Sequence, residues 1–347
     1  MDASIVIPTW NGAALLRKFL PSVIDEAQRY MEDGEGDLEI LVVDDASRDN
    51  TVEILRGLPV QVVQRRQQGG FPTACNSGIA ASRFPYLILL NNDVWIARGF
   101  VTAMLEPFRD PEVFAVTARV FEPDTGLLAT SGKVGRFRRG FWSVYFNYDV
   151  RHPEDGAAPD LLSAYAVGGF CALRSQPAKE WGGFDEMFAP FHWEDIDLSY
   201  RAWKRGWKVV YQPRAVAWHR ASSTINREFC SRKVEVVAVR NRLLFHWKNI
   251  HNGAFVCRHL AMLLALLASR WMVADWSFYT AFRAALRKWP QLKAHRAAEK
   301  SAAVRSDRSV RDILHNFSLG RAVDLYRNER EVKESHHERR RNPDYSQ

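Results

Sequence analysis

The sequence has few cysteines and no close pair of them. Among its 347 residues, the four cysteines are Cys75, Cys171, Cys230 and Cys257. Because no two of them have the C-x-x-C spacing, the sequence argues against a zinc site and against a disulfide framework. We expect the chain to work in the reducing environment of a cytosol.

We also expect no leader segment, and the sequence has no long uncharged run. The β-branched run Ser4–Ile7 follows Met1 almost at once. This leaves no room for a charged region followed by an apolar one, so we expect no secretion signal. In the most apolar stretch, 254–276, the longest uncharged run is Leu260–Ser269, with 10 residues. That is about half of what a membrane-spanning helix requires, so we expect no crossing.

Two interpretations of the stretch 254–276 stay open. Its helical spacing, the flanking Trp271 and Trp276, and the basic stretch 283–288 favour a helix lying on the cytoplasmic face of a membrane. A core helix packed on the rest of the protein would show the same pattern. The first interpretation predicts a cytoplasmic protein with peripheral membrane contact.

Positive charge is concentrated at the end of the chain. The net charge is +8, and residues 281–347 hold 16 Lys and Arg against 9 Asp and Glu. Such an excess suits nucleic acid or an anionic membrane. Because acidic residues are mixed in and no zinc-finger spacing or RNA-binding sequence is visible, we expect no nucleic-acid partner. Its charge density and few apolar residues predict that 328–347 is disordered.

The first 120 residues alternate between strand and helix patterns. Strands are predicted at Ser4–Ile7, Leu38–Val43, Val60–Val63, Tyr86–Leu90 and Phe114–Val120, and helices at Ala13–Ala27, Thr51–Leu55, Ser77–Ala81 and Gly99–Phe108. This alternation implies crossover connections and a mostly parallel central sheet flanked by helices, an α/β fold of the Rossmann-like type.

The pattern changes after this half. The glycine-rich segment Glu122–Leu162 predicts a mobile loop-like insertion. Its aromatic residues suggest a small hydrophobic satellite or an acceptor-binding lip; they are Phe141, Trp142, Tyr145, Phe146 and Tyr148. Beyond it we predict a β-rich segment from Val167 to Arg174, a helix at Asp195–Arg205, strands at Lys208–Tyr211 and Ala215–Trp218, and a long helical region from Cys230 with breaks at Gly253 and Pro290. The predicted units are 1–225, a helical region 226–327 and a tail 328–347.

Three predicted strands end in polar residues. The ends are Pro8-Thr9-Trp10-Asn11-Gly12, Asp44-Asp45-Ala46-Ser47 and Asn91-Asn92-Asp93. In an open parallel sheet, ligands collect beyond the carboxyl ends of the strands. A carboxylate there can accept a base N–H or a ribose hydroxyl, or hold a divalent ion against a diphosphate. Taken singly, each end is also explained as a helix cap or a turn.

A second acidic group lies far along the chain. The sequence Gly182-Gly183-Phe184-Asp185-Glu186 is followed by Glu194-Asp195-Ile196-Asp197-Leu198, which sets three carboxylates at a predicted helix start. One of them can act as a general base, although Asp195 can also cap its helix. Arg201 lies four residues after Asp197, a spacing that allows an ion pair within the helix. Two acidic centres together suggest a metal and a base.

The order of these segments resembles the inverting glycosyltransferases of family 2, whose fold is named GT-A. The resemblance covers roughly residues 3–250 and is carried by an ordered set of motifs. They are Ile5-Val6-Ile7-Pro8-Thr9-Trp10-Asn11, Val42-Val43-Asp44-Asp45-Ala46-Ser47, Ala74-Cys75-Asn76-Ser77-Gly78, Leu89-Leu90-Asn91-Asn92-Asp93 and the block from Gly182 to Arg201.

The resemblance implies a role for each matching residue. It implies that Pro8, Thr9, Asn11, Asp45, Asn76, Asn92 and Asp93 bind the nucleotide-sugar. It places the catalytic base in the pair Asp195 and Glu194, with Asp195 as our choice. Gly169, Asp185 and Glu194 would lie near the sugar and acceptor, and Asp93 and His219 would hold Mg²⁺ or Mn²⁺. The family usually has Asp-x-Asp where this chain has Asn91-Asn92-Asp93.

The implied reaction moves one sugar from a nucleotide-diphospho-sugar to a glycan or polyprenyl-linked acceptor. The Asn-Asn-Asp sequence is similar to that of rhamnosyltransferases, so dTDP-rhamnose or a UDP-sugar is the expected donor. The chain lacks the Gln-x-x-Arg-Trp motif of processive synthases and the Gly-rich, Arg-containing loop of nucleotidyltransferases. A sugar-nucleotide-binding scaffold without turnover and a nucleic-acid-binding protein remain as alternatives.

Overall fold

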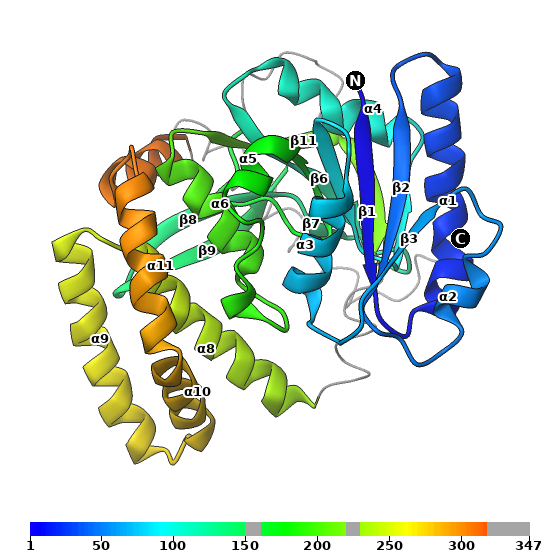
Figure 1. Cartoon of the computed structure of the whole chain (residues 1–347). Coiled ribbons are helices and arrows are strands. Elements are labelled where there is room, and N and C mark those ends of the chain that lie inside the picture. The colour runs from blue at the N-terminus through cyan, green and yellow to red at the C-terminus, as the bar shows by residue number, and fades with distance from the viewer. Residues whose placement is uncertain (150–160, 220–229, 318–347) are drawn as a thin grey trace, which may run out of the picture.

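The computed structural model describes residues 1–149, 161–219 and 230–317, and its strands form a large sheet and a hairpin (Figure 1). The strands are β1 Ala3–Thr9, β2 Leu38–Asp44, β3 Gln61–Gln64, β4 Tyr86–Leu90, β5 Val94–Ile96, β6 Val113–Phe121, β7 Leu128–Thr130, β8 Gly132–Arg138, β9 Phe141–Tyr148, β10 Phe170–Arg174 and β11 Lys208–His219.

Helices surround these strands and form a group of their own towards the C-terminus. The helices are α1 Ala13–Glu32, α2 Thr51–Ile54, α3 Phe71–Ala81, α4 Phe100–Leu105, η1 Glu106–Arg109, α5 Ser175–Glu180, η2 Glu186–Phe188, α6 Glu194–Lys204, α8 Ser231–Asn249, α9 Gly253–Met272, α10 Trp276–Arg287 and α11 Trp289–Ala302. In Figure 1 the group α8–α11 lies on the opposite side of the sheet's strands from α1 and α2.

The large sheet is parallel at one end and mixed at the other. Its order in the described residues is β3-β2-β1-β4-β10-β6-β11-β5, with β7 added to β6. Strands β3, β2, β1 and β4 run parallel, whereas β10 is antiparallel to both of its neighbours. The α/β prediction is confirmed, and the parallel part is the N-terminal half. The carboxyl ends of β1, β2 and β4 therefore meet at one edge.

Both faces of the sheet are buried, which explains the continuous apolar runs of its strands. Successive side chains of a strand point to opposite faces. Ile5 and Ile7 accordingly join a core under α1 and α4, while Val6 between them joins a second core with α3 and α6. The second core continues into α8–α11, so the helical region is packed on the sheet's domain through buried apolar side chains.

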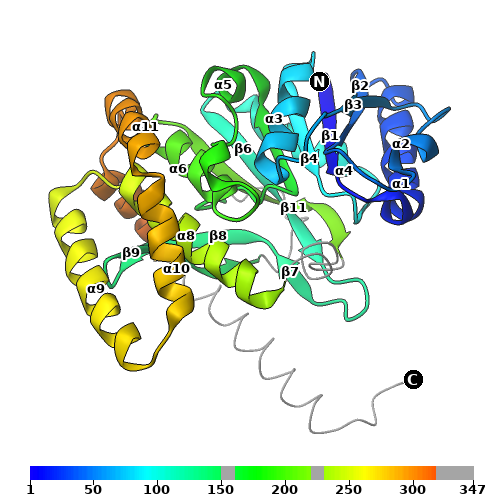
Figure 2. The ribbon, with the colours of Figure 1, turned by 60° about the horizontal axis from the view of Figure 1, so that its bottom comes forward.

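The segment 122–162 is not the loop-like insertion that the sequence predicted, at least over its described part. Residues 128–148 form β7 and the hairpin β8–β9. The satellite prediction is also wrong for Phe141 and Trp142, which belong to the main core, whereas Tyr148 packs in a small separate cluster. The hairpin reaches the helical region (Figure 2). There Phe137 stacks on Phe255 with ring centroids 4.2 Å apart.

The other predicted elements differ from the structure mainly in length. The two short strands predicted at 208–211 and 215–218 form the single strand β11, with an irregularity between Gln212 and Val216. Helix α3 begins six residues before its predicted start at Ser77, because Pro72 suits the first turn of a helix. The predicted unit boundary at 225 and 226 and the predicted tail 328–347 lie outside the described residues.

Helix α9 is long and apolar enough to cross a membrane by length and composition alone, with a mean hydropathy of 1.3. Only one face of it is buried against the protein, by Phe255, His259 and Leu263. The opposite face is exposed, including Leu260 and Leu264. In the described residues this is the single helix that meets these criteria.

A cleft at the carboxyl edge of the sheet as the candidate active site

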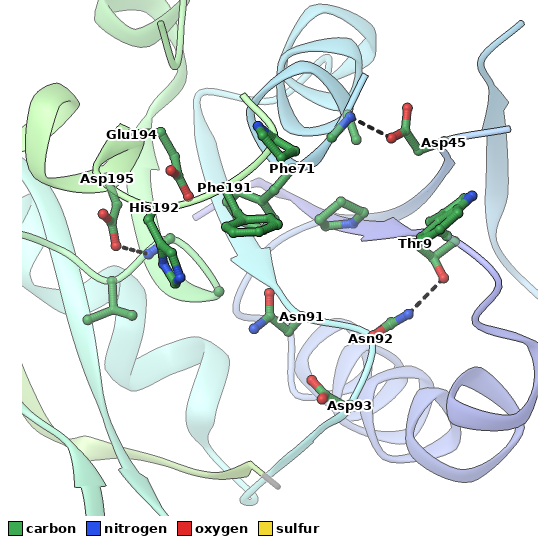
Figure 3. A pocket seen from close by; sticks show the side chains of 18 of the residues that line it. Thr9, Asp45, Phe71, Asn91, Asn92, Asp93, Phe191, His192, Glu194 and Asp195 are labelled. Atoms are coloured by element: carbon green, nitrogen blue, oxygen red, sulfur yellow. Dashed lines mark hydrogen bonds between the residues drawn. The ribbon is translucent and has the colours of Figure 1, made fainter. Parts of the chain in front are cut away.

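One cleft contains most of the residues that the sequence singled out. It has a volume of about 280 Å³ and lies where β1 and β4 end, β10 begins and α6 starts (Figure 3). Nine of the predicted site residues line it. They are Pro8, Thr9, Asp45, Asn92, Asp93, Gly169, Glu194, Asp195 and His219. The acidic groups near 93 and 195, about a hundred residues apart in sequence, thus share one cavity.

One end of the cleft carries a carboxylate and an imidazole side by side. His219 Nε2 lies 3.1 Å from Asp93 Oδ1. They meet because β11 pairs with β5 and places His219 opposite Val94, the residue after Asp93. Next to them, Asn92 Nδ2 donates to Thr9 Oγ1 at 2.8 Å, which joins the ends of β4 and β1.

A glycine brings the start of β10 close to the end of β4. Asn91 N–H donates to the carbonyl of Gly169 at 3.0 Å. A Cβ atom on Gly169 would lie 2.4 Å from the side chain of Asn91, so no larger residue fits without movement. The close approach of Gly169 therefore positions Asn91 in the cleft wall, and the place of Gly169 near the sugar stays a prediction.

The other end of the cleft is formed by the first residues of α6. Asp195 Oδ2 accepts from the N–H of Gly168 at 3.3 Å, and Asp195 Oδ1 accepts from the N–H of Ile196 at 2.8 Å. Glu194 is 6% exposed, and its Oε2 has no hydrogen-bond partner in the described residues. Such a buried acceptor is costly unless a ligand satisfies it.

The two carboxyl groups have different protonation preferences. Burial raises the pKa of Glu194 well above its ordinary value, and the charge of Asp195 raises it further. Burial also raises the pKa of Asp195, but the N–H groups of Gly168 and Ile196 and the charge of Lys133 oppose this rise. Glu194 is therefore the carboxyl that keeps its proton and Asp195 the one that ionises first.

Helix α8 fixes the loop that leads into this pair. Asn241 Nδ2 donates to the carbonyls of Phe188, Phe191 and His192 at 2.6 to 2.9 Å. His192 and Trp193 have positive φ values of 71° and 76°, which are strained for residues other than glycine. The strained turn, held from α8, aims Glu194 and Asp195 into the cleft.

Asp45 lines the cleft but is strongly anchored. Its Oδ1 accepts from Arg65 Nε at 2.8 Å, and its Oδ2 accepts from the N–H of Gly70 at 2.8 Å. The N–H of Gly69 contacts both oxygens. Asp45 therefore ties β2 to the start of α3. Its contact with the nucleobase of a donor stays a prediction.

Three predicted site residues lie outside the cleft lining. Asn11 accepts from the N–H of Arg48 at 2.8 Å and joins two loops. Asn76 exchanges two hydrogen bonds of 2.8 Å with the backbone of Phe184. Asp185 binds Lys248 Nζ at 2.6 Å and His295 Nδ1 at 2.8 Å. In this structure the three side chains make hydrogen bonds and ion pairs within the protein, and their ligand contacts stay predictions.

The structure adds cleft residues that the sequence did not mark. Phe71 begins α3, and Phe191 and His192 belong to the loop before α6; all three face the cavity in Figure 3. Burial lowers the pKa of His192. The Gly69-Gly70 pair before Phe71 is a sequence feature that could have pointed to a turn at this place. Loop aromatics without a motif carry no signal of this kind.

The donor set at Asp93 fits a divalent ion only together with a ligand. The described residues contain no group of three or more His, Cys, Asp or Glu side chains placed to hold a metal. Asp93 and His219 supply one oxygen and one nitrogen donor on the same side of the cleft. Because Mg²⁺ and Mn²⁺ accept few protein ligands when diphosphate oxygens and water complete the shell, the pair is sufficient.

Comparison with known proteins agrees with this geometry. The family model described as "Glycosyl transferase family 2" matches residues 4–182. A pre-mycofactocin glycosyltransferase of Mycobacterium tuberculosis (strain CDC 1551 / Oshkosh) is 26% identical over 235 residues, which are 67% of this chain and 45% of that protein. The chain thus spans less than half the length of this relative.

Two further proteins are similar. The N-acetylglucosaminyl-diphospho-decaprenol L-rhamnosyltransferase of the same organism is 27% identical over 243 residues, 63% of this chain and 76% of that one. The crystal structure of GalNAc-T7 with UDP, GalNAc and Mn²⁺ superposes with a TM-score of 0.54 at 17% identity, covering 73% of this chain and 48% of that one. At this identity the superposition concerns the fold.

Proposed function

Because this chain belongs to glycosyl transferase family 2 and has the GT-A fold, we propose that it transfers a single sugar from a nucleotide-diphospho-sugar to an acceptor hydroxyl. One observation carries this proposal. The pair Asp93 and His219 and the pair Glu194 and Asp195 line the same cleft from different elements. The first pair suits a diphosphate and the second suits proton transfer.

The proposed reaction inverts the configuration of the anomeric carbon. Asp195 takes the proton of the acceptor hydroxyl while the oxygen of that hydroxyl forms a bond to the anomeric carbon. The bond from that carbon to the diphosphate oxygen breaks, and the nucleoside diphosphate leaves with the electron pair. The transition state resembles an oxocarbenium ion, so a base on one face and a departing diphosphate on the other both stabilise it.

Asp195 is better suited than Glu194 to act as the general base. Its two backbone hydrogen bonds hold the side chain and favour the carboxylate form. Glu194, whose pKa is raised more strongly, is suited to donate a hydrogen bond to the sugar or the acceptor. These roles require two carboxyl groups in different environments, and the start of α6 supplies them.

A divalent metal is part of the proposal. Asp93 and His219 would hold Mg²⁺ or Mn²⁺, and the ion would supply positive charge to the leaving diphosphate. Asn92 and Thr9, joined by a hydrogen bond, would lie beside the donor. Pro8 and Asp45 would line the nucleotide end of the cleft.

The donor and acceptor classes follow from the sequence and from similarity. We propose dTDP-rhamnose or a UDP-sugar as donor, because Asn91-Asn92-Asp93 resembles the rhamnosyltransferase pattern and one relative is named as an L-rhamnosyltransferase. We propose a glycan or polyprenyl-linked acceptor in the synthesis of cell-surface polysaccharide. No nucleic-acid partner is proposed.

Replacing Asp93 by Asn tests the donor site. In the presence of Mn²⁺, we expect the variant to bind its nucleotide-sugar at least about tenfold more weakly, because one metal ligand is lost. A thermal-shift panel of nucleotide-sugars, each with and without Mn²⁺, identifies the donor, since a ligand that binds the native state raises its melting temperature. Isothermal titration then gives the affinity of each variant.

The matched control is Asp33→Asn, which changes an exposed carboxylate at the end of α1. It should leave donor affinity and its Mn²⁺ dependence unchanged. If Asp93→Asn and the unmodified protein bind the donor equally well, the metal is not held by Asp93 and lies at another site. Donor binding without product from any acceptor would favour a scaffold without turnover.

We also propose that the α9–α10 surface contacts the cytoplasmic face of a membrane. We define this surface by Trp271, Met272, Val273 and Trp276, which are 51% to 83% exposed. The ring centroids of Trp271 and Trp276 lie 5.5 Å apart. Arg283 and Arg287 lie further along α10. Exposed tryptophans next to basic residues are typical of helices that lie on anionic bilayers.

Vesicle sedimentation tests this contact. The double variant Trp271→Ser/Trp276→Ser should bind vesicles of anionic phosphatidylglycerol about a thousandfold more weakly, since each buried aromatic contributes about 2 kcal/mol and about 1.4 kcal/mol corresponds to a factor of ten. Leu58→Ser, which changes an exposed apolar residue in the N-terminal half, is the control. Failure of the unmodified protein to sediment with these vesicles would contradict the contact.

A further inference from the structure

A second hollow lies beside the start of α6 and has no role in donor binding as proposed above. Its volume is about 510 Å³. The hairpin β8–β9 contributes Lys133, Trp142 and Asn147, and the loop before β10 contributes Tyr165. Arg242 of α8 completes a wall that combines aromatic rings with two cationic side chains.

This hollow and the cleft share the first turn of α6. Trp193, which directly precedes α6, and Ile196 in its first turn line the hollow. Glu194 and Asp195, between them in sequence, line the cleft. The two sites also interact electrostatically, because the charge of Lys133 in the hollow opposes the rise in the pKa of Asp195 in the cleft. A molecule in the hollow would therefore extend towards the proposed base.

Lys133 is the most unusual group in the hollow. It is 8% exposed, and among the described residues its ammonium donates to the amide oxygen of Asn147 rather than to a carboxylate. Burial lowers the pKa of Lys133 to about 8. A buried cation with a neutral partner is costly, and an anionic ligand would offset that cost.

The aromatic residues supply a different kind of contact. Trp142 Nε1–H is buried and has no hydrogen-bond acceptor within the described residues. Tryptophan in such a position normally has an acceptor, which a ligand oxygen would supply. Trp193 and Tyr165 add flat apolar surface, which suits the C–H faces of a sugar ring.

We propose that this hollow is the acceptor subsite and that the acceptor is a saccharide carrying a phosphate or diphosphate group. Lys133 and Arg242 would bind the phosphate, and Trp142, Tyr165 and Trp193 would contact the sugar ring. This assignment rests on the proposed function, since it places the acceptor hydroxyl next to Asp195. The phosphate could belong to a soluble sugar phosphate or link the sugar to a lipid.

Equilibrium binding to the full chain tests the subsite. The probes are glucose 1-phosphate, its decyl phosphodiester and neutral methyl glucoside, each titrated into protein saturated with UDP and Mn²⁺. The unmodified protein should bind one or both phosphate-bearing probes at least about tenfold more tightly than methyl glucoside. Tighter binding of the decyl ester points to a lipid-linked acceptor, and equal binding of the two points to a soluble one.

The variants Lys133→Met and Arg242→Gln should each lower the affinity for the phosphate-bearing probes about tenfold, with unchanged affinity for UDP. Arg138→Gln is the matched control, because it removes an exposed cation from the same hairpin outside the hollow. If Lys133→Met does not fold, Lys133→Arg should keep the preference for phosphate-bearing probes. The affinity of Arg242→Gln for these probes then decides whether the subsite exists.

Equal affinity for the charged and neutral probes, or no loss in the folded variants, overturns the subsite. That outcome is distinguishable from failure of the proposed function. A protein that binds UDP with Mn²⁺ but shows no phosphate preference loses only the subsite. A protein that binds neither nucleotide nor nucleotide-sugar loses the proposed function itself.

Discussion

Replacing Asp195 by Asn is expected to lower the turnover number of sugar transfer by about 10² to 10⁴, the usual contribution of a general base. Asparagine has the same shape and keeps one acceptor oxygen, so it can still accept from the N–H of Ile196 while the longer contact with Gly168 is lost, and the start of α6 should remain in place. Affinity for the nucleotide-sugar should stay within about twofold, because the diphosphate site at Asp93 is formed by other elements. Turnover with purified acceptor and isothermal titration of donor measure the two quantities.

The pH profile gives a second readout of the same change. The base must be ionised to accept a proton, and burial raises the pKa of Asp195. The rate of the unmodified enzyme should therefore fall as pH decreases through that raised pKa. The residual rate of Asp195→Asn should lose this acidic limb.

Glu194→Gln is the matched comparison for Asp195→Asn. It should reduce the rate less, because the amide of glutamine can still donate a hydrogen bond as the protonated carboxyl does. Normal turnover of Asp195→Asn, together with a deep loss in Glu194→Gln, would assign the base to Glu194. Normal turnover in both would remove the start of α6 from the chemistry.

Replacing Asp197 by Ala is expected to destabilise the protein by about 3–5 kcal/mol, the cost of leaving buried charges without their partner. Asp197 is 0% exposed and binds Arg201 Nε at 2.8 Å and Lys248 Nζ at 2.9 Å. It also accepts from Asn249 at 2.7 Å. The carboxylate thus joins α6 to α8, and urea unfolding followed by circular dichroism measures its contribution.

The control is Asp110→Ala, which breaks an equally short but more exposed contact with Lys208 at 2.9 Å. Surface pairs of this kind contribute about 0–1 kcal/mol, so its urea midpoint should hardly move. Similar losses of stability in the two variants would contradict the proposed structural role of Asp197. The distinction matters because Asp197 lies only two residues from the proposed base.

Much of the fold follows from local sequence patterns. The strands β1, β2 and β4 are apolar runs ended by polar residues, and each begins and ends within about two residues of its prediction. The predicted ion pair of Asp197 and Arg201 is confirmed at 2.8 Å. Local spacing was enough in these cases because the partners lie on the same element.

The hairpin β8–β9 could not be predicted in the same way. Its glycines and arginines favour a loop, and its apolar partners come from α8 and α9, about a hundred residues later. Phe137 stacks on Phe255 of α9, for example, and the backbone N–H of Trp142 donates to His246 Nε2 of α8 at 2.6 Å. Position 135 of this strand accommodates only glycine without movement, because a Cβ there would lie 2.5 Å from the ring of Trp142. Only the tertiary structure shows that contact.

The candidate site shows the same division. Residues at strand ends, such as Thr9 and Asp93, were predictable because parallel strands bring their carboxyl ends to one edge. Asn76 and Asp185 belong to the matching motifs yet bond to Phe184 and Lys248 instead of facing the cleft. A motif marks a residue as important, but its partner far along the chain decides whether the role is structural or chemical.

A structure with a bound nucleotide-sugar and Mn²⁺ tests the central claim most directly. We predict that the metal contacts Asp93 and His219 and that the anomeric carbon faces Asp195, with roughly 5–6.5 Å between that carbon and the nearer carboxylate oxygen. This separation leaves room for one acceptor hydroxyl. A donor whose diphosphate lies away from Asp93, or whose anomeric carbon is separated from Asp195 by the cleft wall, would contradict a single active site formed by these two groups.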